Sequence, residues 1–445
     1  MCYSRRRFLA RSLAGTMCLS LGPGVPDVLR RAAVGALEAR AGRHSSPSDR
    51  ILVVLQLSGG NDGLNSVVPH ADDNYARNRR TLRLRADEVQ RIDDYCGWHP
   101  ELRPLGRLFD QGMVSVIQAV GYANSHRGHD EAMRHWHTAQ SDDLFYPTGW
   151  IGRAADVARR PGEPDLPGVF VGSIAQPFAL RARRSVVPSL RRVDQWIVRR
   201  THGASDGAGS GGGGATSPPP APNHEAKPKP TAPSSAVADP AGARPADLVD
   251  FVRRAEEAAW DTSRKVEAVL ARGATAAGYP DCPLGADLST VAQLIRAELG
   301  IRIFFTELGG GGIGGFDNHA GQRDNHAALL RQLAQSVAAF ADDLRREGLF
   351  DRVVLMTFSE FGRTLAENGR RGTDHGAAQP VFLVGGALRG GLFGDPPDLA
   401  TLDQGASEAR IDFRRVYATL LDRWLGLDAP AVLGAAYEPL DVLKG

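Results

Sequence analysis

Residues 51–63 read ILVVLQLSGGNDG, an apolar run that ends in a glycine-rich turn. An apolar run of this length, closed by Gly, Asn and Asp, predicts a β-strand that is buried on both faces. Similar runs recur at 113–119, 301–306, 353–358 and 381–384, with helical patterns between them. The alternation predicts an α/β fold: a doubly wound, mainly parallel sheet with helices on both faces.

The helical patterns lie at 247–271, 286–299 and 413–425, with a further one before residue 348. In that last pattern apolar residues recur at spacings of three and four, at Leu330, Leu333, Val337, Phe340 and Leu344. This spacing predicts one face of an amphipathic helix, and Gly348 is placed to end it. Asp412 is the expected N-cap of the helix at 413–425.

The composition of the chain is that of a globular protein, with one exceptional segment. Of its 445 residues, 42% are hydrophobic and 23% are charged. Residues 201–247 consist mostly of Gly, Pro, Ala, Ser and Thr, which predicts a disordered insertion. The insertion could separate two domains, but we expect it to interrupt a single domain at 51–445. The sequence contains no run of 18 apolar residues, so it predicts no membrane-spanning helix.

The N-terminus predicts export. Residues 4–9, Ser-Arg-Arg-Arg-Phe-Leu, resemble the twin-arginine motif, and the apolar stretch at 9–21 is too short to span a membrane. We expect residues 1–40 to be a signal peptide for the twin-arginine export machinery, which delivers proteins to the periplasm or beyond. A frayed basic start is the alternative. Without residues 1–40 the formal net charge falls from +2 to −3, which argues against nucleic-acid binding. Whether the remaining cysteines, Cys96 and Cys282, form a disulfide stays open.

Polar residues cluster where the predicted strands end. They are Asp62 after the first strand, Arg127, His129, His135 and His137 after the second, Asp317 and His319 after the third, Glu360 and Arg363 after the fourth, and His375 before the fifth. Ligands of such sheets bind at the carboxyl ends of the strands. Carboxylates and imidazoles together suit a divalent metal: zinc first, and manganese or calcium if oxygen ligands dominate.

Structural interpretations of the same residues remain. Asp62 could cap a helix, Glu360 could pair with Arg363, and Asp317 could belong to a simple turn. The glycine-rich turns lack the Gly-Lys-Ser/Thr ending of a phosphate-binding loop and the spacing of a dinucleotide fingerprint, which argues against a bound nucleotide.

Together the motifs resemble domain of unknown function family 1501. The matching stretches are LSGGNDGLN at 57–65, VGY at 120–122 through Trp136 and His137, GWIGR at 149–153, GFDNH at 315–319, TFSEFGR at 357–363, GTDHG at 372–376 and DFRRVY at 412–417. The resemblance runs from about residue 51 to the C-terminus, apart from the insertion. That family is similar to a remote branch of the alkaline phosphatase and sulfatase superfamily, which implies an alkaline-phosphatase-like fold and a metal site.

The resemblance implies roles for particular residues. Asp62, Asp317, His319, Glu360 and His375 match the metal ligands. Arg127, His129 and Arg363 are the catalytic candidates, because the two arginines could offset the charge of an anionic ester substrate.

The sequence departs from the superfamily pattern at two positions, and these departures leave two functions open. Phe361 stands where many members carry a histidine ligand, and Gly128 stands where the family commonly has a serine. A metal-activated water, or Ser125, could replace the missing nucleophile. We therefore expect an exported metal-dependent hydrolase of phosphate or sulfate esters. The alternative is a secreted binding or assembly module that keeps the fold without catalysis.

Overall fold

The computed structural model describes residues 50–158, 168–185, 187–190, 278–310 and 315–444. The predicted insertion, the signal peptide and the helical pattern at 247–271 lie outside these ranges. One large sheet runs through the described part of the chain, with the strand order β13-β5-β12-β9-β1-β8-β6-β7, and β16 also pairs with β5. Its strands are β1 (Ile51–Leu57), β5 (Val114–Gly121), β6 (Gly168–Val171), β7 (Ser189–Leu190), β8 (Ile303–Leu308), β9 (Val353–Phe358), β12 (Gln379–Gly385), β13 (Gly391–Phe393) and β16 (Ile411–Asp412).

The sheet is mainly parallel, as predicted. Strand β1 lies at its centre and pairs in parallel with β8 and β9. Strand β12 is antiparallel to both of its neighbours, β9 and β5. The strands at 51–57 and 353–358 were predicted with the bounds that the structure has, and the ends of the other predicted strands differ by one or two residues.

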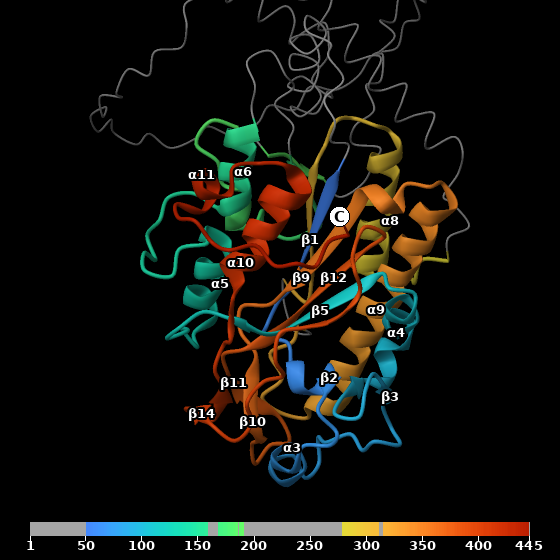
Figure 1. The fold of residues 1–445 in the computed structure, drawn as a ribbon, viewed down its shortest axis with the longest axis vertical. Coiled ribbons are helices and arrows are strands. Elements are labelled where there is room, and N and C mark those ends of the chain that lie inside the picture. The colour runs from blue at the N-terminus through green and yellow to red at the C-terminus, as the bar shows by residue number, and fades with distance from the viewer. Residues whose placement is uncertain (1–49, 159–167, 186, 191–277, 311–314, 445) are drawn as a thin grey trace, which may run out of the picture.

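Helices cover both faces of the sheet, which confirms the doubly wound α/β fold (Figure 1). One face carries α4 (Arg103–Asp110), α8 (Pro283–Arg296) and α9 (Gln322–Arg346). The other carries α5 (His129–Thr138), α6 (Trp150–Ala158), α10 (Phe413–Ala418) and α11 (Ala429–Leu433). Asp412 caps α10 by accepting a hydrogen bond from the Arg414 N–H, as predicted. A π-helical turn, Thr419–Leu425, then continues the predicted helix.

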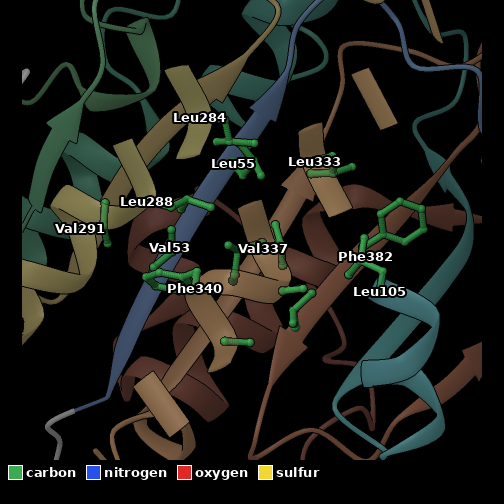
Figure 2. Close-up of a cluster of buried hydrophobic side chains, with 14 of the residues drawn as sticks. Val53, Leu55, Leu105, Leu284, Leu288, Val291, Leu333, Val337, Phe340 and Phe382 are labelled. Carbon is green, nitrogen blue, oxygen red and sulfur yellow. The ribbon is translucent and has the colours of Figure 1, made fainter. Parts of the chain in front are cut away.

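Alternate residues of β1 supply two separate hydrophobic cores. Val53 and Leu55 face α8 and α9, as Figure 2 shows, while Leu52 and Val54 face the aromatic side chains of the opposite layer. This two-sided burial explains why β1 is apolar at nearly every position. The predicted apolar stripe of α9 lies in the first core, and truncating a buried leucine there typically costs about 2–5 kcal/mol of folding free energy.

Small elements surround the carboxyl end of β1. They are the strands β2 (Val67–Val68), β3 (Gln90–Arg91) and β4 (Gly97–Trp98), the helix α3 (Asp73–Asn78), and the hairpins β10 (Arg363–Glu367) with β11 (Thr373–His375) and β14 (Leu402–Asp403) with β15 (Ala406–Ser407). The described ranges contain no helix with the length and apolar character of a membrane span. Cys96 and Cys282 are both free thiols, so the disulfide that the sequence left open does not form.

Candidate metal centre

The turn after β1 brings distant segments of the chain together. Gly59 and Gly60 have φ values of +111° and +80°, a region that favours glycine. A Cβ atom on Gly59 would lie 2.5 Å from the backbone nitrogen of Asp317, and one on Gly60 would lie 2.4 Å from the Phe361 ring. The Gly59 N–H also donates to both carboxylate oxygens of Glu360, at 2.8 and 3.1 Å. The glycines therefore permit the close packing on which the site is built.

Four side chains meet beside this turn, from three places in the fold. His129 is the first residue of α5, and Asp317 and His319 lie between β8 and α9. His375 ends β11, where it pairs across the hairpin with Arg363. His129, Asp317 and His375 each offer one ligand atom within 4.8 Å of the others, a spacing suited to one metal ion.

The Nε2 atoms of the three histidines converge on one carboxylate oxygen. The distances from Asp317 Oδ1 are 3.4 Å to His129, 3.1 Å to His319 and 3.2 Å to His375. The Nε2 atoms of His319 and His375 lie only 2.9 Å apart. His129 Nε2 is buried and has no hydrogen-bond partner among the described residues.

The other ring nitrogen of each histidine contacts a group that can only accept a hydrogen bond. His129 Nδ1 lies 2.8 Å from Glu360 Oε1, and His319 Nδ1 lies 3.1 Å from Asp374 Oδ1. His375 Nδ1 lies 2.6 Å from the carbonyl oxygen of Arg127. In the neutral tautomer that these contacts favour, Nδ1 carries the hydrogen and the Nε2 lone pair is directed to the centre.

These residues fit a divalent metal. Three lone pairs and one carboxylate oxygen, with two ring nitrogens 2.9 Å apart, repel one another unless a cation lies between them. Metal-binding histidines almost always donate their second N–H to a carboxylate or a carbonyl, which is what Glu360, Asp374 and the Arg127 carbonyl provide. Three imidazoles with one carboxylate are a donor set typical of zinc, whereas calcium prefers oxygen ligands alone.

The charges around the centre keep Asp317 ionised. Burial acts to raise the pKa of Asp317, but the hydrogen bond and charge of Arg363, at 2.8 Å, outweigh it and lower the pKa to about 2. The hydrogen bond to Glu360 raises the pKa of His129, and burial lowers the pKa of His375. Phe361 stacks on His375, with the ring centroids 4.5 Å apart, and forms an apolar wall.

Asp62, which the sequence predicts as a metal ligand, is engaged elsewhere. Its oxygens accept hydrogen bonds from Arg79 at 2.5 and 2.9 Å and from Gln322 at 2.5 Å. Burial acts to raise the pKa of Asp62, but the charge and hydrogen bonds of Arg79 outweigh it and lower the pKa. Because its carboxylate is held by these donors, Asp62 is not one of the four side chains from which the candidate centre is formed.

The other predicted residues take positions that only partly match their expected roles. Asp317, His319 and His375 meet as expected of ligands, and His129, expected to be catalytic, joins them. Glu360, expected to be a ligand, contacts His129 rather than Arg363. His135 and His137 are both buried in α5 outside the cluster.

Two contributors were missed by sequence reasoning. Asp374 holds His319 and stands next to His375 in the chain, so an acid beside a predicted ligand was the available signal. Arg79, the partner of Asp62, lies in a region without any recognisable motif, and no local pattern could have identified it.

Comparison with known proteins supports the resemblance that the motifs indicate. The family described as "Protein of unknown function (DUF1501)" matches residues 241–436, which confirms the family resemblance over this part of the chain. No curated protein matches the chain.

Several solved structures are similar at low identity. The lipoteichoic acid synthase LtaP from Listeria monocytogenes is 9% identical, with 87% of this chain and 72% of that one covered and a TM-score of 0.32. The PsFucS1 sulfatase from Pseudoalteromonas sp. is 10% identical, with 94% and 75% covered and a TM-score of 0.34. A protein in the alkaline phosphatase superfamily from Vibrio parahaemolyticus is 8% identical, with 92% and 78% covered and a TM-score of 0.32.

Proposed function

We propose that this protein is an exported, metal-dependent hydrolase of phosphate or sulfate esters. One observation carries the proposal: the Nε2 atoms of His129, His319 and His375 face Asp317 Oδ1, while each Nδ1 is held by an acceptor. These four side chains would hold the ion, and zinc suits them best. A divalent ion bound there would supply Lewis-acid polarisation of an ester oxygen.

The remaining residues hold the ligands in place. Glu360 is only 3% exposed and fixes the ring of His129, while the more exposed Asp374 fixes that of His319. Arg363 holds Asp317 ionised and directed toward the histidines. These contacts hold the three rings in the orientation that an ion at the centre would require.

Water is the nucleophile we propose. Gly128, at the N-cap of α5, offers no hydroxyl at the position where the family commonly has a serine. A direct attack by water transfers the phosphoryl or sulfuryl group in one step, without a covalent intermediate on the enzyme. Ser125 is the alternative nucleophile, and trapping of a phosphorylated or sulfated serine would favour it.

The second candidate function is a secreted binding or assembly module. Gly128 and the packing of Phe361 against His375 favour it, since neither residue contributes chemistry. Elemental analysis of protein purified without added metal, followed by assays with aryl phosphate and aryl sulfate esters, separates the two functions. We expect one zinc per chain and ester hydrolysis that is lost in His129→Ala and His375→Ala.

His126→Ala is the matched control, because His126 lies on the same loop and pairs with Glu131 rather than with the centre. It should keep both metal and activity. Wild-type protein that binds metal but hydrolyses no ester would favour the binding module. Wild-type protein that binds no zinc, manganese or calcium would overturn the proposal.

A further inference from the structure

Two arginines beside the centre, Arg363 and Arg127, donate hydrogen bonds to other groups of the protein. Arg363 is 1% exposed and donates from Nε to the Gly60 carbonyl at 2.8 Å and from Nη1 to the Thr373 carbonyl at 3.0 Å. Its Nη2 donates to the carbonyls of Gly59 and Phe316 and to Asp317. The buried guanidinium thus donates through all three of its nitrogens to groups of the protein itself.

Arg127 is committed in the same way. Its Nη1 donates to the carbonyl oxygens of His375 and Gln404, at 3.4 and 3.0 Å. Its Nη2 donates to the Asp403 carbonyl at 2.8 Å and to the Asp403 carboxylate at 3.0 Å. The guanidinium thus connects β11, the strand that carries His375, to the β14–β15 hairpin. The carboxylate of Asp403 offsets the positive charge of Arg127. The two guanidiniums that were expected to bind the substrate thus make these hydrogen bonds with the protein itself.

The groups in direct contact around the centre therefore have an excess of negative charge. Three carboxylates, of Asp317, Glu360 and Asp374, stand against the guanidinium of Arg363. Imidazoles that bind a metal do so in their neutral form and add no charge. The formal charge of these groups is −2, which one divalent ion brings to zero. A doubly charged phosphoryl group would find no further cation among these groups, and each added charge is repelled by the carboxylates.

We propose that the site takes esters with a single negative charge, phosphodiesters and sulfate monoesters, in preference to doubly charged phosphate monoesters. The proposal rests on the proposed function and names its substrate class. In the reaction the water oxygen bonds to phosphorus or sulfur and the ester P–O or S–O bond breaks. One water proton goes to the leaving alcohol, and the other is left on the new acid group, from which it ionises to solvent. A phosphodiester would yield a doubly charged monoester, which this site should release rather than hydrolyse again.

Binding of two matched inhibitors tests the charge preference without turnover. Phenylphosphonate is doubly charged at mildly alkaline pH, whereas its monomethyl ester keeps one charge. Calorimetry on zinc-loaded protein should show that the monomethyl ester binds roughly tenfold more tightly or better, and zinc-stripped protein should bind neither. Rates should follow: kcat/KM for bis(p-nitrophenyl) phosphate and p-nitrophenyl sulfate should exceed that for p-nitrophenyl phosphate by roughly tenfold or more.

A variant that lacks one carboxylate near the centre gives a second test of the charge preference. Asp403→Asn removes the carboxylate that offsets Arg127 and should narrow the preference for the monomethyl ester. Asp395→Asn is the control, because Asp395 is an exposed carboxylate paired with Arg410. Equal or tighter binding of phenylphosphonate by zinc-loaded wild type would overturn this inference and leave the proposed function standing. A metal-free wild type, measured on the same sample, would overturn both.

Discussion

Arg79 Nη1 lies 2.5 Å from Asp62 Oδ2, and the two side chains are 0% and 2% exposed. The second nitrogen, Nη2, reaches the other carboxylate oxygen at 2.9 Å, so the pair is held at two points. The same guanidinium donates to the carbonyl oxygens of Thr364 and Leu365 in β10. An aspartate just after the first strand thus anchors, through Arg79, the hairpin that carries His375.

Replacing Asp62 by Ala should destabilise the protein by roughly 3–5 kcal/mol, because it leaves the buried Arg79 charge without its partner. Zinc content per folded chain should be unchanged. Chemical denaturation and elemental analysis measure the two effects. The double variant Asp62→Ala/Arg79→Leu should lose less stability than the sum of the single variants. Loss of zinc at unchanged stability would instead make Asp62 a ligand.

Replacing Glu360 by Gln should weaken zinc binding by roughly 10–100-fold while the protein remains folded. The carboxylate accepts the Nδ1–H of His129, and a neutral amide there orients the ring less firmly and makes Nε2 a weaker donor. Competition with a chelator measures the affinity. Glu131→Gln, an exposed carboxylate near the start of α5, is the control and should bind zinc as the wild type does. Equal affinities for both variants would remove Glu360 from the centre.

Asp287 provides a stability prediction that does not depend on the proposed metal. Burial raises the pKa of Asp287 from 3.8 to about 7, against a hydrogen bond from Thr306. Folding therefore favours the protonated form, so this stabilisation is complete below pH 3.8 and is lost as the pH rises through 7. Asp287→Asn should raise Tm above that pH by at least about 2 °C and change little in acid. A Tm that rises equally at all pH values would contradict the assignment.

His137 should act with the opposite sign. Burial lowers its pKa from 6.5 to about 3, and its Nε2 lies 2.7 Å from Gln56 Oε1. The unfolded chain therefore binds a proton that the folded chain refuses, and stability falls as the pH drops from 6.5 toward 3. His137→Gln should flatten this acid-side loss in denaturation curves measured across the range. The exposed His126→Gln serves as the comparison, and an equally steep loss in both variants would refute the role of His137.

Export can be tested on the sequence motif alone. Replacing Arg5 and Arg6 by Lys should leave the precursor in the cytoplasm, because the twin-arginine machinery recognises the arginine pair. Fractionation of cells that express the variant and the wild type measures this. Normal export of the double variant would remove the periplasm from the proposed function.

The sequence predicted the central sheet better than the site. Strands such as β1 and β9 are apolar on both faces, so local pattern alone fixed their bounds. The antiparallel direction of β12 had no such signal, because its pairing with β5 and β9 depends on tertiary contacts. At the candidate metal centre, residue type and position at the strand ends predicted Asp317, His319 and His375, which the structure brings together. The geometry is the basis for proposing His129 as a ligand and Glu360 as the residue that holds it. Sequence spacing could not separate these roles, because a ligand and its supporting residue differ only in the orientation of their side chains.

The residues of the candidate centre lie far apart in the chain, which has a consequence for the order of folding. His129 and Glu360, which touch within the centre, are 231 positions apart in the chain. Contacts this distant in sequence form late, after the loop between them has closed. A metal held at the proposed centre would therefore bind only a chain that is already essentially folded, and its binding energy would be added to the native state alone. Zinc bound there at a free concentration of about a thousand times Kd would add roughly 4 kcal/mol, so occupancy of the centre would report that folding has finished.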